Sequence, residues 1–169
     1  IQEDISTTCG SVKADATQIH QIVMNLTTNA YHAMAETGGD LKVSLEEIQI
    51  DTLDIMDPDM EPGTYACLSV VDTGIGMDKE LLGKIFDPFF TTKEKGKGTG
   101  MGLSVVHGIV AGMNGTIRAY SEPGKGTEFK IYLPMENRDV ERQKTQTQDP
   151  IQGGTEKILL IEDEEDIVK

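Results

Sequence analysis

The feature that most constrains this fold is a long glycine-rich segment, residues 72–102, in which neither a helical nor a strand period persists. Loops of this length are uncommon inside compact domains, and they are usually functional or mobile. We therefore expect helices and strands on both sides of the segment to hold it in place. One short helix is predicted within it, near residues 79–85.

A long helix is predicted before this segment. Asp15 is a favourable N-cap residue, and the pattern that follows runs to about Glu36, where Gly38 and Gly39 stop it. Apolar side chains recur along it at helical spacing, which predicts one buried face. These apolar positions are Ile19, Ile22, Val23, Leu26, Ala30 and Ala33.

Strand patterns lie before and after the glycine-rich segment. They cover residues 41–50, 65–71, 115–120 and 127–133, and the last two are expected to form a hairpin with EPGKG as its turn. A second helix is predicted over residues 103–113, and residues 1–13 carry a weak strand signal. This order predicts an α/β two-layer sandwich, in which helices cover one face of a mixed, mostly antiparallel sheet.

The composition changes after Pro134. Residues 135–156 contain few apolar side chains and are predicted to form a linker. Residues 157–169 begin with KILLIEDEED, a buried-strand pattern that ends in acidic side chains. The sequence thus predicts one domain over residues 1–134, then a linker and a short terminal segment.

Charge and cysteine content exclude several classes of function. The net charge of −14 argues against a nucleic-acid partner, because nucleic-acid-binding surfaces are usually basic. Lys93, Lys95 and Lys97 nevertheless gather in one loop, which suits a small anionic ligand, although a solvated loop has the same composition. Cys9 and Cys67 form no zinc or disulfide pattern, so a cytoplasmic location is expected, compatible with a membrane-anchored parent protein.

Three polar residues form a stripe on the first predicted helix. Asn25, Asn29 and His32 are spaced by four and three residues, at the edge of the buried face. Two amide oxygens one turn apart can both face a hard cation such as Mg²⁺. Taken alone, such a pair more often caps neighbouring backbone or faces water.

Two glycine motifs begin and end the long segment. The first is DTGIGM, residues 72–77, in which the carboxylate of Asp72 can accept a hydrogen bond from a ligand amine while the glycines admit its ring. The second is GKGTGMGLS, residues 96–104, which precedes a helix whose first N–H groups favour a phosphate. Neither is a P-loop or a dinucleotide fingerprint, and each alone is compatible with a simple turn or loop.

Together with two further motifs, these segments resemble the ATP-binding domain of sensor histidine kinases, within the larger family of gyrase, MutL-type and heat-shock chaperone ATPases. The five matching motifs follow the family's order from about residue 15 to residue 134. They are HQIVMNLTTNA, DTGIGM, IFDPFFTTK, GKGTGMGLS and GKGTEFKIYLP. The third motif, rich in phenylalanine, points specifically to histidine kinases. The family fold, the Bergerat α/β sandwich, agrees with the predicted layers.

The resemblance implies a site for ATP and Mg²⁺. It implies that Asn29, together with Asn25, holds Mg²⁺ and that Asp72 binds the adenine amino group. Asn29, His32 and Lys93 are the residues implied to take part in phosphoryl transfer. Further nucleotide-binding residues implied by the motifs are Gly74, Gly76, Phe86, Lys97, Gly98, Thr99, Gly100, Gly102, Leu103 and Thr127.

The resemblance also implies a reaction, in which the γ-phosphoryl group passes to a histidine on a separate dimerisation domain of a homodimeric parent protein. Hydrolysing relatives carry a glutamate base where this chain has Asn25, so hydrolysis is disfavoured. A family position that is often aromatic is Ala33 here, which leaves no ring to stack on adenine. His20, His32 and His107 match no acceptor motif. A gyrase- or chaperone-type ATPase and a non-catalytic nucleotide-binding module remain the alternatives.

The last residues resemble the start of a receiver domain. Glu162 and Asp163 match the acidic pair that holds Mg²⁺ beside a phosphorylated aspartate, although an arbitrary acidic tail has the same composition. The match implies a hybrid kinase in two-component signalling, with a response regulator or receiver domain as its partner.

Overall fold

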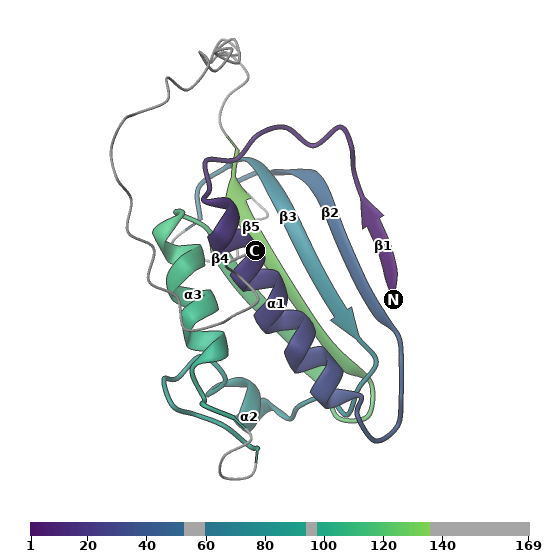
Figure 1. Cartoon of the computed structure of the whole chain (residues 1–169). Helices are drawn as coiled ribbons and strands as arrows, with labels where there is room; N and C mark the ends of the chain where they lie inside the picture. Colours follow the sequence, from purple (N-terminus) through teal and green to yellow (C-terminus); the bar gives the residue numbers. More distant parts are fainter. Residues whose placement is uncertain (53–59, 94–97, 136–169) are drawn as a thin grey trace, which may run out of the picture. The chain divides into compact units, whose positions relative to one another are not determined.

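A computed structural model describes residues 1–52, 60–93 and 98–135. Within these residues, five strands form one sheet in the order β1-β2-β3-β5-β4 (Figure 1). The strands are β1 (Gln2–Ile5), β2 (Leu41–Ile50), β3 (Gly63–Asp72), β4 (Thr116–Glu122) and β5 (Gly126–Pro134). The helices in the same part of the chain are α1 (Ala16–Ala33), α2 (Lys79–Leu82) and α3 (Gly102–Gly112). Because β1 runs parallel to β2 and the other neighbouring strands pair antiparallel, the expected mixed, mostly antiparallel sheet is confirmed.

Helices α1 and α3 lie side by side on one face of the sheet, as Figure 1 shows. Their apolar faces meet the sheet there and form the main core. The largest side chains with at most 1% of their surface exposed are Ile22, Leu26, Val70, Val106, Val110 and Ile131. Burying a side chain of this size contributes about 1.5–3 kcal/mol, so this layer holds both helices firmly against the strands.

The start of α1 follows the local sequence, but its end does not. The carboxylate of Asp15 accepts a hydrogen bond of 2.7 Å from the N–H of Thr17, as an N-cap should. The helix ends at Ala33 instead of near Glu36, because the carbonyl oxygen of Ala33 accepts a hydrogen bond of 3.1 Å from the N–H of Ile75. A loop from β3 therefore takes the acceptor that one more helical turn would use.

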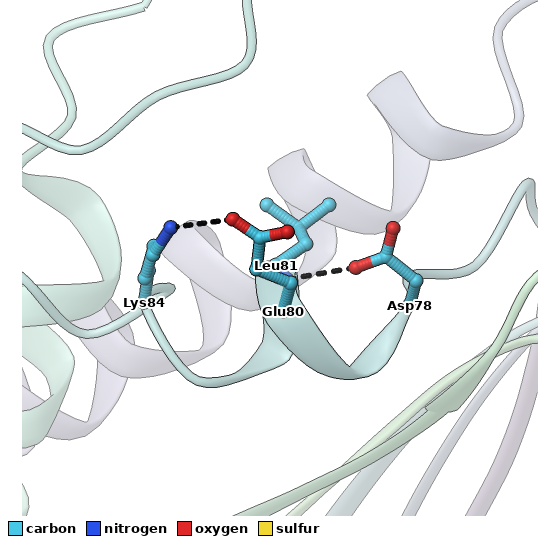
Figure 2. A network of polar contacts seen from close by, with 4 residues as sticks. All are labelled: Asp78, Glu80, Leu81 and Lys84. Carbon is cyan, nitrogen blue, oxygen red and sulfur yellow. Dashed lines mark hydrogen bonds and ion pairs between the residues drawn. The ribbon is translucent and has the colours of Figure 1, made fainter.

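The short helix α2 is held by its own side chains (Figure 2). The carboxylate of Asp78 accepts a hydrogen bond of 2.8 Å from the N–H of Leu81, which caps the helix. Lys84 donates to the carboxylate of Glu80 at 2.8 Å on the solvent side. The helix ends at Leu82, earlier than expected, and residues 83–86 continue as turns.

Several expectations lie outside the described residues. They are Lys95, Lys97, the linker beyond Met135 and the receiver-like segment 157–169. None of the helices in the described residues is both long enough and apolar enough to cross a bilayer.

Candidate functional site

One cavity of about 840 Å³ lies among α1, the loop after β3, the loops before α3 and the start of β5. Most of the residues singled out from the sequence line it. They are Asn25, Asn29, His32, Asp72, Gly76, Lys93, Gly98, Thr99, Gly100, Gly102, Leu103 and Thr127. Segments far apart in the chain therefore meet around one space large enough for a small-molecule ligand.

Two of the expected residues do not line this cavity, and Lys97 lies outside the described residues. Gly74 donates its N–H to the carboxylate of Asp72 at 2.8 Å, and a Cβ on Gly74 would come within 2.7 Å of the carbonyl oxygen of Ala33. Its lack of a side chain therefore lets the loop approach α1. Phe86 packs against the core, with its ring centroid 5.4 Å from that of His107.

Asp72 provides a buried hydrogen-bond acceptor in the cavity wall. It ends β3, opposite Thr127 on β5, and only 5% of Asp72 and 6% of Thr127 is exposed. Burial raises the pKa of the Asp72 carboxyl, and the backbone N–H groups of Gly74 and Thr127 partly offset this rise. These N–H groups also fix the direction of the carboxylate, so it faces a ligand as an oriented acceptor.

Two glycines bring the loop after β3 against the β4–β5 hairpin. Gly76 and Gly126 have φ values of +67° and +107°, in the region that favours glycine. A Cβ on Gly76 would collide with the carbonyl oxygen of Glu122, and one on Gly126 with that of Asp72. This backbone-on-backbone approach makes a rigid wall for the cavity.

A second part of the cavity carries amide oxygens and a cation. The Lys93 ammonium donates to the side-chain oxygen of Asn29 at 3.3 Å, and burial lowers the pKa of Lys93. The side-chain amide of Asn25 donates to the carbonyl oxygen of Gln21 at 2.9 Å. Its oxygen lies 2.9 Å from where a Cβ on Gly102 would stand, so the start of α3 approaches it closely.

This arrangement fits a metal ion that arrives with an anionic ligand. Within the described residues, no group of three or more His, Cys, Asp or Glu side chains could hold a metal by itself. The amide oxygens of Asn25 and Asn29 are hard donors, which suit Mg²⁺ when phosphate oxygens and water complete its shell. The N–H groups at the start of α3 add a favourable field for phosphate.

The phenylalanine motif supports the loop that leads into α3. Phe89 has a φ of +67°, unusual for a residue with a side chain, and 74% of it is exposed. Gly100 packs against the backbone of Phe89, and a Cβ there would collide with it. Phe90 lines the cavity instead.

Some residues that support or line the cavity lie in sequence patterns that predict no role there. Ser121, on β4, accepts the N–H of Met77 at 2.8 Å and so ties the glycine loop to the hairpin. A single serine in a strand pattern indicates nothing by itself. Further apolar lining comes from Ile75, Met77, Leu81, Ile85 and Phe129, which sequence patterns assign simply to the core or to loops.

Comparison with known proteins gives consistent results. Residues 14–137 match the family model described as histidine kinase-, DNA gyrase B- and HSP90-like ATPase. The chain is 41% identical over 163 residues to sensor kinase CckA of Brucella abortus (strain 2308), a match that covers 91% of this chain but 17% of CckA. It therefore spans a minor part of the length of that relative.

Solved structures share the fold. The crystal structure of full-length ShkA in complex with AMPPNP matches with a TM-score of 0.60 and 26% identity, over 79% of this chain and 25% of that one. The catalytic domain of histidine kinase ThkA matches with a TM-score of 0.58 and 31% identity, over 78% of this chain and 77% of that one.

Proposed function

Because this chain belongs to the histidine kinase-, DNA gyrase B- and HSP90-like ATPase family and carries the catalytic domain of a sensor histidine kinase, we propose how its cavity works. The cavity binds ATP with Mg²⁺ and presents the γ-phosphoryl group to a histidine on a separate dimerisation domain. The observation that carries this proposal is the meeting of a buried acceptor, Asp72, with the oxygens of Asn25 and Asn29 around one cavity.

The base of ATP is recognised at Asp72. Its carboxylate is held by backbone N–H groups, so it accepts from the exocyclic amino group of adenine. Gly76 lines the cavity, and because its missing side chain lets the loop pack against the hairpin, the loop backbone forms a wall beside the flat ring. Ala33 offers no aromatic ring, so the faces of the base rest on apolar side chains that line the cavity, such as Met77 and Leu81.

The phosphates lie along α1 and the start of α3. Asn29, together with Asn25, holds Mg²⁺, which when bound neutralises charge on the phosphates. The cation of Lys93 and the backbone of the glycine segment from Gly98 to Gly102 surround the same groups. His32 is exposed on this side of α1 and adds a further contact.

Transfer to another domain is favoured over hydrolysis. A general base that activates water typically contributes about 10²–10⁴-fold, and Asn25 cannot serve as one at neutral pH. His20 is exposed on α1, and His107 lies against Phe86, so neither is placed in the cavity. The acceptor histidine accordingly belongs to a dimerisation domain of a homodimeric parent protein.

The wider assembly follows from the same proposal. Residues 135–156 act as a linker, and residues 157–169, with Glu162 and Asp163, begin a receiver domain, so the parent is a hybrid kinase that signals to a receiver or response regulator. The length of CckA beyond the matched part supports a larger parent protein. The catalytic domain works in the cytoplasm, and nucleic acid is not a partner.

Calorimetric titration with ATP, with and without Mg²⁺, tests the binding site. Radiolabelled ATP should then label a separately produced dimerisation domain when this chain is added, with the label sensitive to acid. The chain alone should bind ATP but neither label itself nor release phosphate rapidly. Acid-labile label on the chain alone, or rapid phosphate release, would contradict the proposed division of roles.

A further inference from the structure

The hydroxyl of Ser121 lies among three polar groups where the glycine loop meets the β4–β5 hairpin. It accepts a hydrogen bond of 2.8 Å from the N–H of Met77 and donates one of 2.9 Å to the carbonyl oxygen of Gly126. The hydroxyl oxygen of Thr127 lies 2.9 Å from the same Ser121 oxygen. Ser121 is thus bonded to the loop, to the hairpin and to a residue that lines the cavity.

The direction of each of these hydrogen bonds follows from the numbers of hydrogens and lone pairs that the groups carry. A serine hydroxyl has one hydrogen and two lone pairs. A carbonyl oxygen can only accept, so the hydrogen of Ser121 goes to Gly126, while the N–H of Met77 takes up one lone pair. The contact with Thr127 must then use the second lone pair of Ser121, which makes the Thr127 hydroxyl the donor.

These hydrogen bonds make the Thr127 hydroxyl an acceptor on the side of the cavity. Its only hydroxyl hydrogen points at Ser121, so its oxygen offers lone pairs to a ligand. Asp72, its register partner on β3, offers a carboxylate beside it. Both residues line the cavity, and this part of the wall therefore presents two acceptors.

We propose that Ser121 is a positioning residue that, through Thr127, makes the site select an amino-substituted purine over an oxo-substituted one. An amino group carries two hydrogens and satisfies acceptors, whereas a carbonyl oxygen placed against them leaves that oxygen and the acceptor that faces it unpaired. This inference rests on the proposed ATP site and adds a determinant of its base selectivity.

A purely structural role for Ser121 makes a different prediction. If its hydroxyl only joined the loop to the hairpin, its loss would weaken all purine nucleotides by the same factor. The positioning role instead changes the ratio of two affinities, because the freed Thr127 hydroxyl can rotate and donate to a carbonyl oxygen.

The test compares ATP with inosine triphosphate, in which an oxo group replaces the amino group and N1 carries a hydrogen, by calorimetry on the full chain with Mg²⁺. The wild type should prefer ATP, and Ser121→Ala should reduce the ratio of the Kd for inosine triphosphate to the Kd for ATP by about fivefold, the factor of one typical hydrogen bond. Ser121→Thr, which keeps the hydroxyl, should retain the wild-type ratio.

Ser69→Ala is the matched control. It removes a buried serine hydroxyl from the same sheet, one that bonds Glu128 at 3.3 Å and does not line the cavity. The ratio should stay at the wild-type value in this variant.

The outcomes separate this inference from the proposed function. A wild type that binds ATP selectively while Ser121→Ala keeps its ratio would overturn the role of Ser121 alone. A wild type that binds neither nucleotide would overturn the ATP site itself. If Ser121→Ala does not fold, Ser121→Cys carries the test, because a thiol is a weak acceptor, and an unchanged ratio there would equally overturn the role.

Discussion

The ammonium group of Lys93 lies 3.3 Å from the side-chain oxygen of Asn29, and so joins the end of the phenylalanine motif to the second half of α1. This is the oxygen that the proposed Mg²⁺ site requires. In the proposed site Lys93 and the metal would use the same acceptor, so Lys93 would turn toward the phosphates when Mg²⁺ binds. Burial lowers the pKa of Lys93, and an anionic partner would oppose this shift because it favours the charged form.

Substituting Asn29 tests the metal site. Asn29→Ala should lose the Mg²⁺-dependent part of ATP affinity and abolish phosphotransfer, because Asn25 alone would then supply an amide oxygen to the metal. Folding should be retained, since Asn29 is only half-buried at the edge of the core. Calorimetry with and without Mg²⁺ measures the effect. Thr27→Ala is the control, because the Thr27 hydroxyl bonds the carbonyl oxygen of Val23 within the helix. Full Mg²⁺ enhancement in Asn29→Ala would exclude it as a ligand.

Substituting Asp72 tests adenine recognition. In Asp72→Asn an oriented carboxylate becomes an amide, and a hydrogen bond to a charged group contributes about 1.5–3 kcal/mol. ATP affinity should therefore fall by about 10- to 100-fold. Asp87→Asn changes the same charge at an exposed position outside the cavity and should leave the affinity unchanged. Near-equal affinity in a folded Asp72→Asn variant would contradict the assignment.

The pH dependence of binding should reflect the same carboxylate. Burial raises the pKa of Asp72 above its ordinary value of 3.8, so it loses its charge at a higher pH than an exposed aspartate. ATP affinity should accordingly fall with decreasing pH before ordinary aspartates titrate. The effect on stability has the opposite sign. The pKa of Asp72 is higher in the folded protein than in the unfolded one, so this shift stabilises the fold at pH values below the unfolded-state pKa. That stabilisation is lost as the pH rises through the folded-state pKa.

The control for this pH dependence is Asp72→Asn. Its ATP affinity should change with pH only through the titration of the nucleotide and of other groups. Calorimetry over a pH series measures both proteins. Parallel profiles for the two would show that Asp72 does not titrate as described.

The two interactions of α2 in Figure 2 should differ in their effect on the site. Asp78→Ala removes an N-cap, which typically costs about 1 kcal/mol, and it should loosen Leu81, which lines the cavity. Glu80→Ala removes only a solvent-exposed ion pair with Lys84, worth about 0.3–0.5 kcal/mol. Asp78→Ala should weaken ATP binding several-fold more than Glu80→Ala, and equal affinities would refute this coupling.

Local sequence signals were sufficient to predict much of the arrangement of helices and strands. The bounds of β2 are those predicted, and Asp15 caps α1 as expected, because N-caps and side-chain periodicity depend on neighbours in the chain. Most of the residues singled out from the motifs also line the cavity. These agreements follow from short-range chemistry that each segment carries with it.

Long-range contacts decided the rest. Ala33 ends α1 because Ile75 reaches its carbonyl oxygen, and Gly74 serves that approach without lining the cavity. The pairing of Asp72 with Thr127 and the bonds of Ser121 exist only once β3, β4 and β5 are assembled. No local pattern records which backbone will approach a given carbonyl or hydroxyl. The sequence by itself therefore determined the elements and the kinds of group at the site, whereas only the tertiary structure decided their directions and partners.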